Sequence, residues 1–128
     1  MLDASALLAV LDGDARSTKV VDLLESGAES GDCLLMSVVN WAEVYSVTWR
    51  GRGQAAADSR LAAIDRLPLQ LVDVDAPTAK LAATIEVRFG LAFADCFAAA
   101  LAWSRRATIV TADHDFRVLK KQVELMLV

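Results

Sequence analysis

Short apolar segments of the kind that form buried strands alternate along this chain with longer segments of helical periodicity. The strand segments are 1–3, 33–36, 69–74, 108–111 and 123–128. The helical segments between them are 5–11, 18–28, 37–50, 54–66, 75–90 and 91–105. Residues 34–36 and 109–110 are apolar without alternation, which is typical of a sheet covered on both faces. The pattern therefore predicts an α/β fold, a mainly parallel sheet of about five strands between two helical layers.

The composition fits one folded domain spanning residues 1–128 and restricts the metal site that it can hold. Hydrophobic residues make up 55% of the chain, and the mean hydropathy is +0.40, which excludes intrinsic disorder. Cys33 and Cys96 belong to no CxxC pair, and His114 is the only histidine. A disulfide scaffold and a cysteine- or histidine-rich zinc site are therefore disfavoured. Oxygen ligands remain, and these favour Mg²⁺, Mn²⁺ or Ca²⁺.

Charge and hydropathy indicate a cytoplasmic protein that does not enter a membrane. The net charge of −4 and the pI of about 4.9 are not those of a strongly basic nucleic-acid binder. An enzyme that meets nucleic acid through bound cations is still compatible with them. Asp3 stands where a signal peptide requires positive charge. No apolar run reaches the roughly 18 residues of a membrane span, so we expect reduced thiols and no membrane contact.

Three acidic residues lie at predicted strand ends, the edge where open α/β sheets bind ligands. Asp3 ends the first strand segment and precedes a helix. Its alternative role is to cap that helix. Asp113 and Asp115 follow the segment 108–111, and at least one of them is expected to join a site. Capping of the following turn is the alternative for the other.

Two further carboxylates interrupt helical segments that are otherwise apolar. Glu43 lies in a segment that is apolar nearly all round, which predicts a buried helix, and Asn40 shares its face. A structural ion pair with an arginine is the alternative for Glu43. Between Leu91 and Trp103, Asp95 is the only polar side chain besides the thiol of Cys96. A buried carboxylate is costly unless it is paired, hydrogen-bonded or bound to a cation.

Converging carboxylates could not all stay ionised without cations, so the cluster predicts one or two bound Mg²⁺ or Mn²⁺ ions. Such ions support the hydrolysis of a phosphodiester. The chain contains no GxxxxGK[ST] or GxGxxG motif, which argues against nucleoside triphosphates and dinucleotides as ligands. A single histidine without a nucleophile elbow argues against a serine–histidine triad.

Four segments, 2–9, 37–44, 91–95 and 111–116, resemble in order and spacing the motifs of PIN-domain ribonucleases, specifically the VapC-type toxins of VapBC toxin–antitoxin pairs. The resemblance implies a PIN-like three-layer sandwich and a Mg²⁺- or Mn²⁺-dependent endoribonuclease that cleaves RNA. It also implies a homodimer and a cognate VapB-type antitoxin that covers the site. The residues that it implies as acidic ligands, in order, are Asp3, Glu43, Asp95 and Asp113. It makes Asp115 an accessory carboxylate, and the polar residues that it implies to orient the ligands are Ser5, Asn40 and Thr111.

One departure concerns the start of the chain, because only Met1 and Leu2 precede Asp3. Most family members have more residues there, so either the first strand is short or the native start lies upstream.

Two alternative functions are weighed against the nuclease. A non-catalytic PIN-like module that binds RNA or protein would be signalled by loss of an acidic position, and none is lost. A receiver-type phospho-acceptor domain requires an acidic pair after the first strand, where Asp3 stands alone. The most basic stretch suits either RNA phosphates or a solvated helix face, and its arginines are Arg50, Arg52, Arg60 and Arg66.

Overall fold

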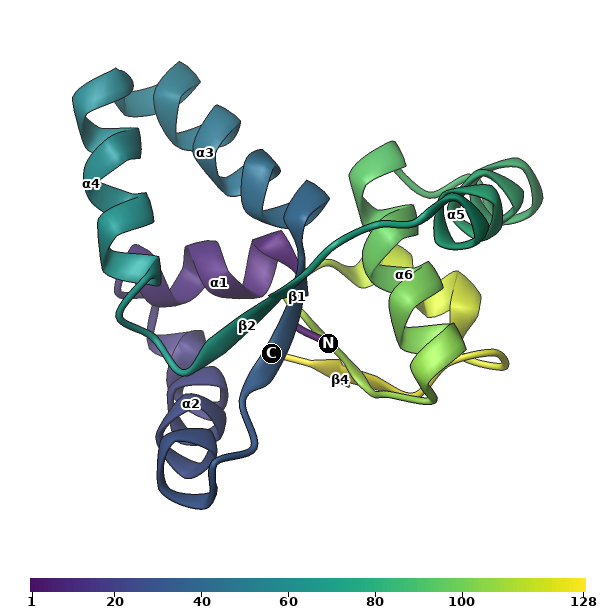
Figure 1. The fold of residues 1–128 in the computed structure, drawn as a ribbon, viewed down its shortest axis with the longest axis horizontal. Helices are drawn as coiled ribbons and strands as arrows, with labels where there is room; N and C mark the ends of the chain where they lie inside the picture. Colours follow the sequence, from purple (N-terminus) through teal and green to yellow (C-terminus); the bar gives the residue numbers. More distant parts are fainter.

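The structure, a computed structural model, describes residues 1–128 and has an α/β architecture (Figure 1). Its helices are α1 (Ala4–Leu11), α2 (Thr18–Ser30), α3 (Val38–Arg52), α4 (Gln54–Ile64), α5 (Ala76–Phe89) and α6 (Phe93–Arg105), with the 3₁₀ helices η1 (Ala15–Ser17) and η2 (His114–Leu119). Its strands are β1 (Leu34–Ser37), β2 (Leu69–Val72), β3 (Ile109–Thr111) and β4 (Leu125–Leu127). None of the helices has the combination of length and apolar character needed to cross a bilayer.

Residues 1–3 join two pairs of parallel strands into one sheet. β1 pairs with β2, and β3 pairs with β4, both in parallel. Leu2 lies between the pairs: it forms a parallel bridge with Val110, and its N–H donates to the carbonyl of Leu35 at 2.7 Å. The N–H of Asp3 donates to the carbonyl of Val110 at 3.0 Å. The order is therefore β2, β1, residues 1–3, β3, β4. The predicted parallel sheet is confirmed, although its first strand is reduced to a single bridge because α1 begins at Ala4.

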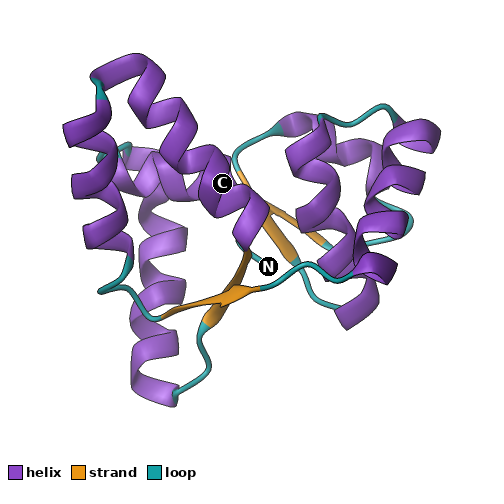
Figure 2. Ribbon diagram, turned by 45° about the horizontal axis from the view of Figure 1, so that its top comes forward, coloured by secondary structure: helices purple, strands orange, loops and turns teal.

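Helices cover both faces of this sheet (Figure 2). Neighbouring residues of a strand point to opposite faces, and the two hydrophobic cores follow that alternation. Met1 and Ile109 belong to the core formed with α5, α6 and η2. Leu2 and Val110 belong to the core formed with α1, α2 and α3. This explains why residues 109–110 are both apolar, as the sequence pattern indicated for a sheet buried on both sides.

Several local expectations are corrected by the structure. The first helix begins at Ala4 rather than Ser5, and the side chain of Asp3 caps it by accepting from the N–H of Ser5. The last predicted helix begins at Phe93 rather than Leu91, because Ala92 adopts an extended backbone conformation. α3 is not buried all round, since Trp49 is 45% exposed. Its core-facing side is Asn40, Val44 and Thr48.

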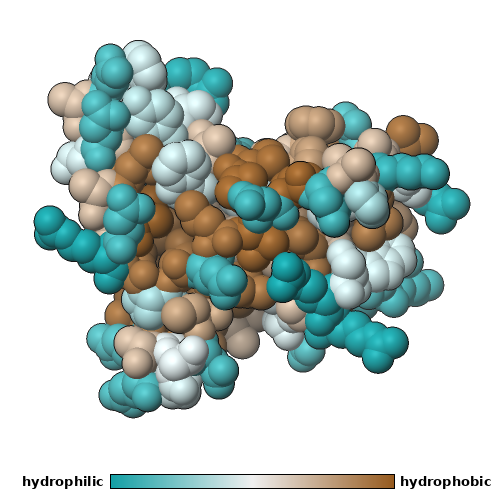
Figure 3. Space-filling view, in the orientation of Figure 1, coloured by the Kyte–Doolittle hydropathy of each residue, from teal (hydrophilic) through white to brown (hydrophobic).

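The face of the molecule seen in Figure 1 carries apolar side chains across its middle, where β2 passes in front of β1 (Figure 3). β2 is the edge strand on this side of the sheet, and Leu71 on it is 39% exposed. An exposed apolar edge strand is a surface that proteins usually cover.

Asp12 at the end of α1 binds the hairpin formed by α3 and α4. Its carboxylate forms ion pairs with Arg52, at 3.0 Å, and with Arg60. The side chain of Arg60 is only 12% exposed and also donates to Oγ1 of Thr48 at 3.3 Å. A nearly buried guanidinium needs its partner, because an unpaired charge in such a place is costly.

We predict that Asp12→Ala destabilises the protein by about 1–3 kcal/mol, since it leaves Arg60 without its carboxylate. Urea unfolding should report the loss as a lower transition midpoint with an unchanged slope. Asp22→Ala is the control, because Asp22 is exposed on α2 and forms no ion pair. Equal losses in the two variants would contradict the prediction.

Candidate metal centre

Three carboxylates from distant parts of the chain converge at the carboxyl end of the parallel strands. One oxygen from each of Asp3, Glu43 and Asp95 lies within 4.8 Å of the corresponding oxygens of the other two. Asp3 is 1% exposed and Asp95 8% exposed, while Glu43 is half-buried. Asp3 follows the central bridge, Glu43 lies on α3 after β1, and Asp95 lies in the first turn of α6.

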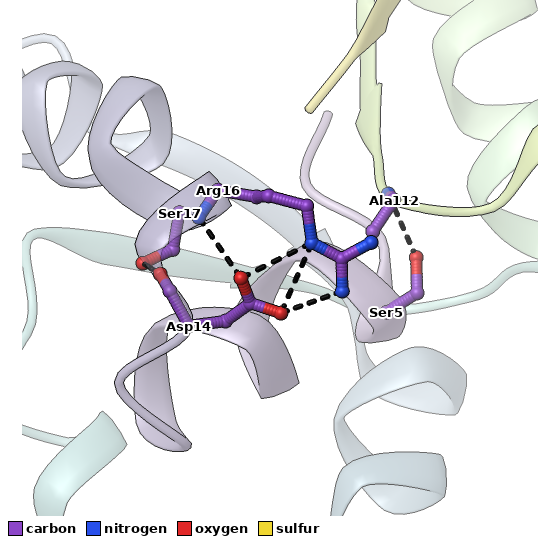
Figure 4. A network of polar contacts seen from close by, with 5 residues as sticks. All are labelled: Ser5, Asp14, Arg16, Ser17 and Ala112. Atoms are coloured by element: carbon purple, nitrogen blue, oxygen red, sulfur yellow. Dashed lines mark hydrogen bonds and ion pairs between the residues drawn. The ribbon is translucent and has the colours of Figure 1, made fainter.

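Two hydroxyl groups and a backbone N–H hold one oxygen of Asp3. Its Oδ2 accepts from Ser5 Oγ at 2.6 Å, from Thr111 Oγ1 at 3.0 Å and from the N–H of Ser5 at 3.2 Å. Ser5 Oγ in turn accepts from the N–H of Ala112 at 3.0 Å (Figure 4), and Thr111 Oγ1 accepts from that of Asp113 at 2.9 Å. The two hydroxyl oxygens also lie 3.0 Å from each other. Each hydroxyl has one proton, and the carboxylate is the strongest acceptor within reach of both, so both protons are assigned to Asp3. Asp3 therefore caps α1 and faces the cluster at the same time.

Asn40 connects the cluster to the start of α6. Its Nδ2 donates to Asp3 Oδ1 at 3.3 Å and to the carbonyl of Ala94 at 3.1 Å. The side chain is fully buried, and its Oδ1 has no hydrogen-bond partner. The contact with Ala94 fixes α6, and with it Asp95, against α3. Sequence reasoning missed Ala94 because a backbone carbonyl leaves no side-chain signal.

Glu43 carries a buried oxygen, Oε2, that has no hydrogen-bond partner. Burial and the negative charge of Asp3 raise the pKa of Glu43, against the opposing effects of the Asn40 amide and the positive charge of Arg50. No arginine forms an ion pair with Glu43, because the three ion pairs of the structure involve Asp12 and Asp14 only. The structural ion pair considered as an alternative for Glu43 is thus absent.

Asp95 is the most strongly perturbed carboxyl of the centre. Burial, together with the negative charges of the neighbouring acidic groups, Asp3 first, raises the pKa of Asp95 to about 7. α6 carries no basic side chain near its first turn, so within the helix only the partial positive charge of its N-terminus opposes the cost of ionising Asp95.

Asp113 and Asp115 lie at the edge of the centre. Asp113 caps η2 by accepting from the N–H of Asp115 at 2.8 Å, the capping role that the sequence left open for one of the pair. It is partly buried and is not among the three mutually close carboxylates. Asp115 and His114 are exposed. The negative charges of both aspartates nevertheless contribute to the raised pKa of Asp95.

The donor set fits a hard divalent cation. Three carboxylates without a basic partner repel one another, and the unpartnered oxygen of Glu43 is buried beside them. Mg²⁺ and Mn²⁺ bind carboxylate oxygen, and such a cation would satisfy the buried oxygen and relieve the repulsion.

A model of the PIN-domain family matches residues 1–122. The chain belongs to the PIN-domain family. PIN domains are generally nucleases that use divalent metals. The resemblance deduced from the four sequence motifs is thereby confirmed at the level of family and fold.

Two solved structures share the fold of this PIN domain. A toxin–antitoxin complex from Klebsiella pneumoniae is 16% identical, with a TM-score of 0.63 over 90% of this chain and 88% of that chain. The second is VapBC2 from Rickettsia felis, bound to a DNA fragment from the VapBC2 promoter. It is 17% identical, with a TM-score of 0.75 over 98% of this chain and 96% of that chain. A comparison with curated proteins finds no match.

We predict that Asp95→Asn stabilises the metal-free protein above neutral pH. The pKa of Asp95 is about 7 in the folded state and about 3.8 as a free group. The wild type therefore loses stability as the pH rises from about 4 to about 7, because only the folded state resists ionisation of Asp95. Thermal unfolding with EDTA should give the variant the higher Tm at pH 8, with an advantage that shrinks toward pH 4.

Asp14→Asn is the control, because Arg16 holds the pKa of Asp14 at about 2, below its free value. Ionisation of Asp14 therefore favours the folded state, whereas ionisation of Asp95 disfavours it. This substitution should give no gain in Tm at pH 8. An Asp95→Asn variant that is less stable than wild type at pH 8 would contradict the electrostatic account.

Proposed function

We propose that this PIN domain, spanning residues 1–128, is a metal-dependent endoribonuclease and the toxin of a toxin–antitoxin pair. The observation that carries the proposal is the convergence of Asp3, Glu43 and Asp95 around a buried, unpartnered carboxylate oxygen. The cytoplasm is the proposed compartment, in keeping with the free thiols of Cys33 and Cys96.

In this proposal Asp3, Glu43 and Asp95 hold Mg²⁺ or Mn²⁺, with Asp113 as a fourth acidic ligand and Asp115 as an accessory carboxylate. The chemistry that such an ion supplies is Lewis-acid activation of an RNA phosphodiester and of the water that hydrolyses it. Ser5 and Thr111 donate to Oδ2 of Asp3, and Asn40 donates to its Oδ1, so the carboxylate is held in a fixed orientation. Asn40 keeps α3 and α6 at the separation that the cluster requires.

The proposed partners are RNA, a VapB-type antitoxin and a second copy of the chain. The solved structures of similar fold are described as a toxin–antitoxin complex and as VapBC2, which supports the antitoxin as partner. An arginine of the antitoxin would bind the carboxylate cluster through charge-assisted hydrogen bonds and replace the cation electrostatically. The exposed apolar surface at β2 is available to a homodimer.

We predict that the purified protein cleaves RNA into discrete fragments with Mg²⁺ or Mn²⁺ and that EDTA abolishes cleavage. Asp95→Asn should lower the cleavage rate at least about 100-fold, because losses of 10–100-fold already follow the removal of residues that only support metal ligands. Asp14→Asn, which removes a partly exposed carboxylate outside the cluster, should retain the wild-type rate.

A folded wild type that binds RNA without cleaving it would favour the non-catalytic PIN-like module instead. Equal cleavage by Asp95→Asn and wild type would exclude Asp95 as a ligand.

We predict that Thr111→Val weakens metal binding about 10–100-fold by removing one of the hydroxyl donors to Asp3. Thr111 is fully buried, and valine matches its shape, so the fold should persist. The midpoint of a Mn²⁺ titration, followed by the rise in Tm, measures the effect. Thr108→Val is the control, because Thr108 Oγ1 donates to Glu124, outside the cluster. An unchanged midpoint for Thr111→Val would show that its hydroxyl does not support the metal.

A further inference from the structure

Arg50 lies on the same face of α3 as Glu43. The two residues are seven positions apart, which is close to two full turns, so their side chains leave the helix in nearly the same direction. The separation along the helix axis is about 10.5 Å at 1.5 Å per residue. The positive charge of Arg50 acts on Glu43 in the candidate metal centre, because it lowers the pKa of Glu43, which burial and Asp3 raise.

The structure divides the basic stretch of the sequence into paired and unpaired arginines. Arg52 and Arg60 both form ion pairs with Asp12. Arg50 is exposed and forms no ion pair. Its guanidinium is therefore available to an external anion in the fork geometry that suits phosphate.

α3 has no acidic side chain between Glu43 and Arg50. Ser46 and Val47 occupy the intervening turn, and Val47 is 38% exposed. Ser46 Oγ donates to the carbonyl of Glu43 at 3.1 Å and so adds no free charge. An anionic strand could follow this face of α3 away from the carboxylates without meeting another acidic side chain of the helix.

We propose that Arg50 is a positioning residue that binds a backbone phosphate neighbouring the one at the metal centre, so that single-stranded RNA lies along the Glu43 face of α3. The inference rests on the proposed nuclease function and names the path of its substrate. A protein with a net charge of −4 repels RNA around an acidic centre, and a cation beside that centre offsets the repulsion for the flanking phosphate.

The alternative is that Arg50 has only a structural role, which would have different consequences. Arg50 lies in the last turn of α3, where a cation stabilises the carbonyl end of the helix. That role would affect thermal stability and leave RNA binding unchanged. Arg105 is a matched control because it is exposed, forms no ion pair and lies in the last turn of α6, ten residues from Asp95.

The test compares Arg50→Ala, Arg50→Lys and Arg105→Ala in an Asp95→Asn background, which keeps the RNA intact. Fluorescence anisotropy with a labelled 12-nucleotide oligouridylate in Mg²⁺ gives Kd at several KCl concentrations. Arg50→Ala should raise Kd about tenfold and reduce the slope of log K against log salt by ~0.7, the value for one lost phosphate contact on a single strand. Arg50→Lys should keep the wild-type slope, and Arg105→Ala should keep both slope and Kd.

Cleavage kinetics with Asp95 restored provide the second measurement. Arg50→Ala should raise KM about tenfold with kcat within twofold of wild type, while the Tm rise with Mn²⁺ stays unchanged. If the protein binds and cleaves RNA but Arg50→Ala and Arg105→Ala have equal slopes and Kd values, the proposed role of Arg50 is wrong and the proposed nuclease function stands. A wild type that neither binds nor cleaves RNA would overturn the proposed function itself.

Discussion

The hydrogen bonds of residues 1–3 are the constraint on which the rest of the structure depends. β1 with β2, and β3 with β4, are separate ladders that meet only through this segment. Leu2 bonds to Leu35 on one side and pairs with Val110 on the other. Asp3 is the next residue, so the interaction that closes the sheet also places the first carboxylate at its carboxyl edge. Sheet continuity and assembly of the candidate centre are thus one structural event.

The carboxylates of the centre repel one another, and packing elsewhere in the fold must keep them close together. Three close carboxylates without a basic partner favour separation, and burial adds to the cost of ionising Asp95. α6 resists that separation through fully buried small residues, which let it pack closely against its neighbours: Ala98, Ala99, Ala100 and Ala102. The bond from Asn40 to the carbonyl of Ala94 locks the same helix at its first turn. The clustered carboxylates therefore lower the stability of the metal-free protein, and in return the site is already assembled to bind a cation.

The sequence was sufficient to predict the fold class and the carboxylates that converge, because both have local signals. Apolar runs without alternation marked a doubly covered sheet, and Asp95 was conspicuous as a lone charge in an apolar helix. The relation of Asp113 to the cluster could not be predicted in the same way. Both its capping role and its distance depend on how the turn after β3 is oriented. The degree of burial of α3 was also misjudged, because its apolar residues surround the helix while the fold covers only one side.

Pairs of side chains far apart in the sequence leave no periodic signal, and the Asp12 cluster shows the functional consequence. The sequence presents Arg50, Arg52 and Arg60 as one basic stretch. In the fold, a single carboxylate at the end of α1 engages two of these arginines to hold the helical hairpin. Arg50 is left free because the axial rotation of α3 turns it toward the Glu43 face. The contact that stabilises the hairpin therefore engages Arg52 and Arg60 and leaves Arg50 as the unpaired arginine on the Glu43 face of α3.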